Sequence, residues 1–114
     1  MSTNRKKSKP EVVGYARVST REQHLRLQID AIKDHGVDRL VIEKQSGVKQ
    51  RPKLEKLLKE LRKDDTLVIW KLDRLGRSAV ELISLSEQFT KDGINFVSIT
   101  DRVDTTTPAG KMQF

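Results

Sequence analysis

The feature that most constrains the fold is an alternation of short apolar runs with amphipathic segments along the chain. The apolar runs, each suited to a buried strand, cover residues 12–18, 40–42, 66–72 and 94–99. The segments with helical periodicity cover residues 21–35, 52–63 and 78–91. Repeated strand–helix units predict an α/β fold of three layers, in which a mostly parallel sheet of four or five strands has helices on both faces. The optional fifth strand would be a short one within the polar loop 101–107.

Local signals predict where the helices begin and end. Ser78 with Glu81 three residues later forms a capping box at the start of a helix. Gly36 and Gly93 follow helical segments and are suited to left-handed C-terminal caps. The pair Thr107-Pro108 is suited to open one more helix, with the threonine as cap and the proline in the first turn.

The charge of the chain favours a polyanionic partner. There are 23 Lys and Arg residues against 16 Asp and Glu residues, which gives a formal net charge of +7. Four of the basic residues lie within residues 1–10, which contain no acid and read as a disordered basic arm. The remaining residues, 11–114, carry 19 basic and 16 acidic side chains, a net charge of only +3. Charge is therefore consistent with nucleic acid but does not decide the partner.

Composition excludes several classes of protein. A chain of 114 residues is long enough for one small domain. The absence of cysteine excludes disulfide scaffolds and thiolate zinc sites. No apolar run reaches the roughly 20 residues that cross a bilayer, and no apolar stretch follows the basic N-terminus as in a signal peptide. We therefore expect a cytoplasmic protein.

Polar residues gather where the predicted strands end. Arg17 and Ser19 close the first strand, and the segment Asp73–Arg77 (DRLGR) directly follows the third. Ligands of open α/β sheets bind beyond the carboxyl ends of the strands, so these clusters are candidates for one site. A further polar loop, Ser46–Arg51, follows the second strand.

Each cluster also has a simpler interpretation when taken alone. Ser19 with Glu22 fits a capping box, so Ser19 could serve only as a helix cap. Arg17 could be an ordinary ion-pair partner, and Arg51 an exposed loop residue. Residues 73–77 could form a solvated turn with a local Asp–Arg pair.

The combination of one serine with several arginines is suited to attack on phosphorus. Guanidinium groups stabilise the negative oxygens of a pentacovalent phosphorus transition state. Both histidines, His24 and His35, fall on the first predicted helix, which gives little support to a Ser–His–Asp arrangement. A glycine-rich phosphate loop of the GxxxxGK[ST] type is absent from the sequence.

Several of these residues, taken in order, resemble the catalytic domain of serine recombinases of the resolvase/invertase type. They are YARVST at 15–20, Gln28, Ser46-Gly47, Arg51-Pro52, KLDRLGR at 71–77 and Gly110-Lys111-Met112. The resemblance spans about residues 12–114 and implies a site-specific DNA recombinase that forms a 5′-phosphoseryl intermediate without metal, ATP or another cofactor.

The resemblance also implies roles for individual residues. Ser19 matches the nucleophile, and Arg17, Arg74 and Arg77 match the arginines of the active site. The other matching positions of the family's active site are Asp73, Arg51, Gln28 and Ser46.

The domain organisation follows from the same resemblance. We expect a basic arm at residues 1–10 and a catalytic domain at 11–114, with the chain truncated before the family's long dimerisation helix and helix-turn-helix DNA-binding domain. The full-length protein would bind double-stranded DNA as a homodimer or tetramer, whereas this chain alone would be weakly associated or monomeric, and inactive in recombination. Two alternatives stay open: a metal-dependent nuclease that uses Glu43, Asp73, Asp101 and Asp104, and a non-enzymatic flavodoxin-like interaction module.

Overall fold

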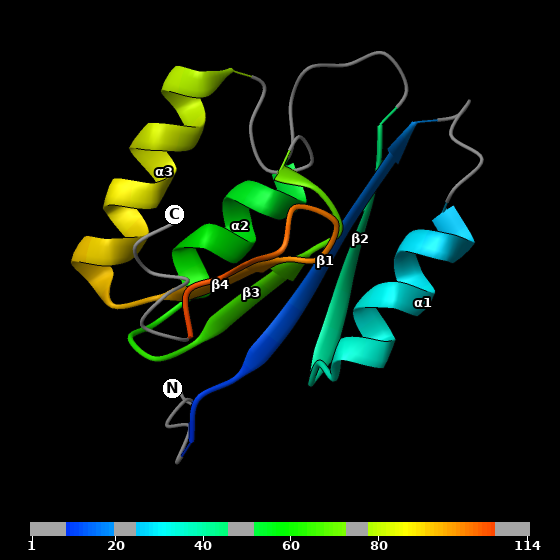
Figure 1. The fold of residues 1–114 in the computed structure, drawn as a ribbon, viewed down its shortest axis with the longest axis horizontal. Coiled ribbons are helices and arrows are strands. Elements are labelled where there is room, and N and C mark those ends of the chain that lie inside the picture. The colour runs from blue at the N-terminus through cyan, green and yellow to red at the C-terminus, as the bar shows by residue number, and fades with distance from the viewer. Residues whose placement is uncertain (1–8, 20–24, 46–51, 73–77, 107–114) are drawn as a thin grey trace.

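A single five-stranded sheet lies between two layers of helices in the computed structural model, which describes residues 9–19, 25–45, 52–72 and 78–106 (Figure 1). The strands are β1 (Val12–Ser19), β2 (Arg39–Gln45), β3 (Thr66–Ile69), β4 (Asn95–Ser98) and β5 (Val103–Asp104). The helices are α1 (Leu25–His35), α2 (Pro52–Glu60) and α3 (Ala79–Asp92).

The strand order is β2-β1-β3-β4-β5. The first four strands are parallel to their neighbours, and β5 pairs antiparallel with β4. The predicted α/β fold, with a mostly parallel sheet of four or five strands, is therefore confirmed. The short strand predicted within residues 101–107 is β5.

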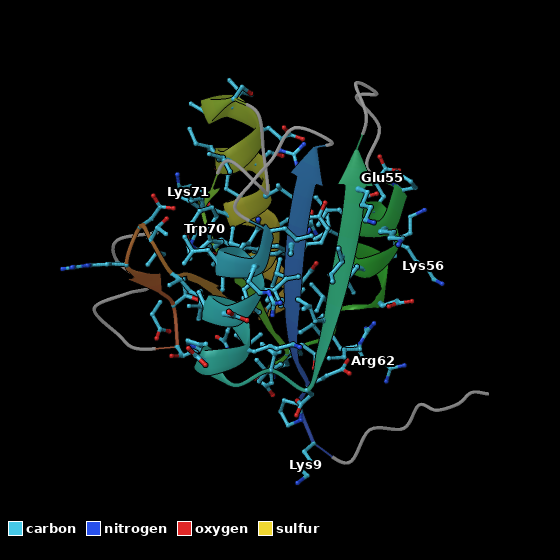
Figure 2. All side chains as sticks on the ribbon, turned by 90° about the vertical axis from the view of Figure 1, so that its right-hand side faces the viewer. Lys9, Glu55, Lys56, Arg62, Trp70 and Lys71 are labelled. Atoms are coloured by element: carbon cyan, nitrogen blue, oxygen red, sulfur yellow. The ribbon has the colours of Figure 1, made fainter. Side chains whose placement is uncertain are left out.

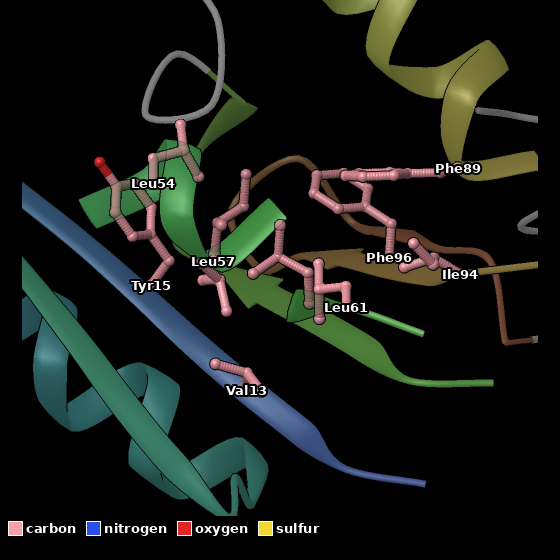
Figure 3. Close-up of a cluster of buried hydrophobic side chains, with 10 residues drawn as sticks. Val13, Tyr15, Leu54, Leu57, Leu61, Phe89, Ile94 and Phe96 are labelled. Carbon is pink, nitrogen blue, oxygen red and sulfur yellow. The ribbon is translucent and has the colours of Figure 1, made fainter. Parts of the chain in front are cut away.

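Alternation along β1 divides the core into two clusters, one on each face of the sheet. Val13 and Tyr15 lie in the cluster that α2 and α3 cover, which also contains Leu57 and Phe96 (Figure 3). Ala16 belongs to the smaller cluster beneath α1, with Ile32 at its centre. Helices on both faces were predicted, and the clusters show which helix covers which face.

Three predictions lie partly or wholly outside the residues that the structure describes. The helix was predicted over 21–35, and it ends as expected at His35, where Gly36 follows with a φ of 96°. The predicted residues 21–24, the basic arm up to residue 8 and the helix at Thr107-Pro108 lie outside the described residues.

Helix α2 ends at Glu60, three residues before the predicted end at Lys63. The carboxylate of Asp65 accepts a hydrogen bond from Arg62 N (2.8 Å) and another from Glu11 N (2.9 Å). Asp65 therefore directs the chain out of the helix and connects it to the residue that precedes β1.

Helix α3 has the predicted ends. Ser78 Oγ accepts a hydrogen bond from Glu81 N (3.2 Å), which is the first half of the predicted capping box. Gly93 lies in the left-handed region with a φ of 74°, and its N–H reaches the carbonyl groups of Phe89 and Thr90.

Strand β3 ends at Ile69, although the apolar run predicted a strand to Leu72. Beyond Ile69 the backbone bonds to the loop between β4 and β5. Trp70 O accepts from Thr100 N (2.9 Å), and Leu72 N donates to the carboxylate of Asp101 (2.8 Å). Apolar side chains continue to Leu72 because they pack on the core, while the backbone has already left the regular ladder.

None of the helices in the described residues is both long and apolar enough to cross a membrane.

Candidate active site

The two segments that carry the sequence motifs lie on neighbouring strands. β1 and β3 are adjacent in the middle of the sheet, with Tyr15 opposite Ile69. After β1 the chain continues to α1 on one face, and after β3 it continues to α3 on the other face (Figure 1). Ligands of open α/β sheets bind at such a switch point, outside the carboxyl ends of the strands.

The last residues of β1 extend beyond the end of β3. Residues up to Ser19 pair with β2, where Ser19 lies opposite Gln45, but pairing with β3 stops at Tyr15. Four residues of an extended strand span about 13 Å. Among the described residues, the β3-facing edge of Ala16–Ser19 therefore has no strand beside it.

Gln28 lies against this edge. Its Oε1 accepts a hydrogen bond from Arg17 N (3.1 Å), and the residue is fully buried in α1. Gln28 Nε2 is buried and has no hydrogen-bond partner in the described part of the chain. A buried amide without an acceptor costs about 1–3 kcal/mol, and a phosphate oxygen is an acceptor that would satisfy it. Of the predicted site residues, Arg17 and Gln28 are thus brought together.

Arg17 lies in the row of side chains that contains Val13 and Tyr15, because alternate residues of a strand share a face. It is half-buried, and its Nε atom is shielded from solvent. Its register neighbour on β2 is Glu43. Arg17 therefore lies beside a carboxylate-bearing residue of β2 in the register of the sheet.

Glu43 is a buried residue of this region that the active-site prediction did not include. Only 3% of its surface is exposed. Its Oε1 accepts from the Tyr15 hydroxyl (2.7 Å) and from Leu54 N (3.2 Å), and its Oε2 accepts from Lys53 N (2.9 Å). One carboxylate therefore connects β1, β2 and the first turn of α2. The signal in the sequence was a glutamate directly after the apolar run Leu40–Ile42.

The remaining predicted site residues lie mostly outside the described residues. Those outside are Ser46, Arg51, Asp73, Arg74 and Arg77. Ser19 is described as the last residue of β1. The backbone thus places Ser19 at the carboxyl end of β1. Leu72, which directly precedes Asp73, lies three residues after the end of β3.

An aromatic–cation pair follows β3. The Lys71 ammonium lies 5.0 Å from the centre of the Trp70 ring, and Trp70 is only 9% exposed. Figure 2 shows Trp70 and Lys71 across the molecule from Glu55 and Lys56 of α2. The pair places a positive charge one residue before Leu72.

The acids proposed for a metal-dependent nuclease have separate roles where they are described. Glu43 accepts three hydrogen bonds as given above, and Asp101 accepts from Leu72 N and from Ser98 Oγ (2.6 Å). Asp104 accepts from Thr106 N (2.9 Å). No group of three potential metal ligands occurs among the residues that the structure describes. Asp73, the fourth acid, lies outside them.

Comparisons with known proteins agree on one family. Residues 12–114 match the family described as "Resolvase, N terminal domain". The chain is 51% identical over 104 residues to the transposon Tn917 resolvase of Enterococcus faecalis, covering 90% of this chain and 56% of that protein. It is 48% identical over 104 residues to the serine recombinase gin of Escherichia phage Mu, covering 90% of this chain and 54% of that protein. The chain therefore spans about half the length of these curated relatives.

A solved structure also has this fold. The crystal structure of the N-terminal catalytic domain of TP901-1 integrase matches with a TM-score of 0.70 and 30% identity. The match covers 90% of this chain and 86% of that chain.

Proposed function

This chain belongs to the resolvase N-terminal domain family, and we propose that it is the catalytic domain of a serine site-specific DNA recombinase. The relatives are named as a transposon resolvase, DNA-invertases and serine recombinases. The proposed catalytic domain covers residues 11–114, preceded by a basic arm at residues 1–10.

In the proposed reaction, Ser19 Oγ loses its proton and attacks the phosphorus of a DNA phosphodiester. The bond from phosphorus to the 3′-oxygen breaks, the released oxygen takes up a proton to become a 3′-hydroxyl, and the 5′-phosphate stays joined to the serine. Attack by the 3′-hydroxyl of a different strand reverses these steps and releases the serine. The ester bond conserves the energy of the phosphodiester, so the cycle requires no ATP.

The arginines supply the positive charge in this proposal. Arg17, Arg74 and Arg77 would contact the phosphate oxygens, whose negative charge grows in the transition state. Arg51 would add a fourth guanidinium, with Asp73 beside the arginines. Gln28 and Ser46 would support the site, and no metal ion has a role in it.

The observation that carries the proposal is that Ser19 ends β1 and that Gln28 lies against the edge of β1 that extends beyond the end of β3. β1 ends at Ser19, at the switch point of the sheet, and Leu72, which follows β3, directly precedes DRLGR in the sequence. Gln28 Nε2 is buried, close to Arg17, and has no acceptor among the described residues, which supports an anionic ligand at the same edge.

The proposed partner of the full-length protein is double-stranded DNA, bound by a homodimer or tetramer in the cytoplasm. The formal net charge of +7 favours a polyanion. Because residues 11–114 carry only +3, most of the DNA affinity would come from regions beyond this domain. This chain alone would therefore bind DNA weakly and would not recombine it.

A chimera tests the nucleophile. Residues 12–114 replace the matching segment of the Tn917 resolvase, and the chimera is incubated with a nicked suicide substrate that contains the recombination site of that resolvase. We expect a protein–DNA adduct that survives denaturing electrophoresis and forms equally in EDTA. Ser19→Ala should abolish the adduct, whereas the control Ser84→Ala, on an exposed position of α3, should not. An adduct that persists in Ser19→Ala would show that the nucleophile has been assigned wrongly.

A further inference from the structure

The loop between β4 and β5 is bonded to the backbone that follows β3. Ile99 N donates to Ile69 O (3.0 Å), and Thr100 N donates to Trp70 O (2.9 Å). The hydroxyl of Thr100 donates to the same carbonyl (2.8 Å). Residues 99 and 100 thus continue the contact between β3 and β4 after both strands have ended.

Asp101 extends this contact by one side chain. Its Oδ2 accepts hydrogen bonds from Leu72 N (2.8 Å) and from Ser98 Oγ (2.6 Å). Ser98 is fully buried at the end of β4, so it fixes the carboxylate relative to the sheet. The Asp101 side chain is exposed, so packing in the core does not determine which residue occupies this position.

Leu72 is therefore fixed from two directions. Its side chain packs against the core cluster that α2 and α3 cover, and its N–H is bound by Asp101. The chain has left the β3 ladder at Ile69, so without the carboxylate this N–H would have no partner among the contacts that the structure gives for Leu72.

Leu72 is the residue immediately before Asp73. Consecutive Cα atoms are about 3.8 Å apart, so any displacement of Leu72 is transmitted to the start of the segment 73–77. Within the proposed function, that segment supplies Arg74 and Arg77 to the phosphate. A misplacement of about 1 Å at a reacting centre can lower a rate 100-fold.

We propose that Asp101 is a positioning residue of the active site, which binds the backbone N–H of Leu72 and so fixes the residue from which the chain enters the segment 73–77. This inference rests on the proposed function. In this proposal, Asp101 does not contact DNA and acts only through its hydrogen bond to Leu72 N.

The Tn917 chimera tests the proposal through the rate of adduct formation in a single turnover. Asp101→Ala should lower that rate about 10- to 100-fold without changing DNA affinity, because positioning affects the reacting geometry. Asp101→Asn keeps an oxygen that can accept from Leu72 N and should recover most of the rate. The matched control is Asp104→Ala, which removes an aspartate of the same hairpin and should leave the rate unchanged.

Two results in this assay would overturn the proposal. One is a wild-type rate in Asp101→Ala. The other is an equal loss in Asp101→Ala and Asp101→Asn that tracks a lowered midpoint of thermal unfolding, which would indicate a purely structural role.

Hydrogen exchange in the 114-residue chain separates this proposal from the proposed function. The Leu72 amide should be protected from exchange, and Asp101→Ala should remove that protection while Asp104→Ala keeps it. If the wild-type chimera forms no adduct but the Leu72 amide behaves in this way, the proposed function fails and the contact stands. An unprotected Leu72 amide in the wild-type chain overturns the positioning role, whatever the chimera does.

Discussion

Replacing Glu43 by alanine should destabilise this domain more than the loss of any exposed acid. The buried carboxylate accepts hydrogen bonds from the Tyr15 hydroxyl and from the backbone N–H groups of Lys53 and Leu54. The two N–H groups belong to the first turn of α2, where a helix has no internal acceptors for its donors. Glu43 therefore acts as a cap supplied by a neighbouring strand.

The magnitude follows from the bonds that are lost. Removal of a side chain that caps a helix costs about 0.5–2 kcal/mol. A buried polar group that loses its hydrogen-bond partner costs about 1–3 kcal/mol, which applies to the 2.7 Å bond from Tyr15. We expect Glu43→Ala to lower the free energy of unfolding by about 2–4 kcal/mol, a large share of the 5–15 kcal/mol typical of a domain.

Urea denaturation measures this loss. Trp70 is the single tryptophan of the chain and is 9% exposed, so its emission reports unfolding. A double-mutant cycle with Tyr15→Phe isolates the hydroxyl–carboxylate bond. The cost of Tyr15→Phe should be at least about 1 kcal/mol smaller in the Glu43→Ala background, because the bond is already absent there.

The control is Glu87→Ala, at an exposed position of α3, which should change stability by no more than about 0.5 kcal/mol. The reasoning is refuted if Glu43→Ala costs less than about 1 kcal/mol, or if the effects of the Tyr15 and Glu43 substitutions simply add.

Two further substitutions test the packing on either side of the sheet. Gly14→Ala would place a methyl group in overlap with Ile32 Cγ2 of α1, and should cost about 1–3 kcal/mol in urea denaturation; an unchanged midpoint would mean that α1 shifts freely. Thr105→Val removes the hydrogen bond from Phe96 N to Thr105 Oγ1 (2.7 Å) and the weaker one back to Phe96 O (3.3 Å), at a buried position. It should lower stability by about 1–3 kcal/mol in a thermal melt, and a neutral effect would contradict a role for Thr105 in attaching β5.

The alternation of strands and helices could be predicted because burial on both faces gives each strand a near-continuous apolar run. The same signal misplaced the end of β3, since Leu72 is apolar for its packing on the core and not because its backbone lies in a strand. The end of α2 was missed for a similar reason. Leu61 continues the apolar periodicity, while Asp65 already binds the backbone of Arg62.

Local sequence pattern indicated only part of the candidate site, and the other predicted residues, such as Gln28, came from the family resemblance. Arg17 and Ser19 were recognisable from their position at the end of an apolar strand. The contact of Gln28 with Arg17 joins two elements, and periodicity in α1 gave no sign that a glutamine would be buried beside Ile32. The role of Asp101 toward Leu72 spans 29 positions in the chain, so spacing within a motif could not indicate it.

The two-sided core has a consequence for how such a domain could diversify. Ile32 of α1 rests on one cluster and Phe89 of α3 on another, with the sheet between them. Repacking beneath α1 would therefore shift α1 against the sheet and leave the packing of α3 on the opposite face unchanged. Substitutions in one cluster could thus adjust the helix that follows β1 without moving the helix that follows β3.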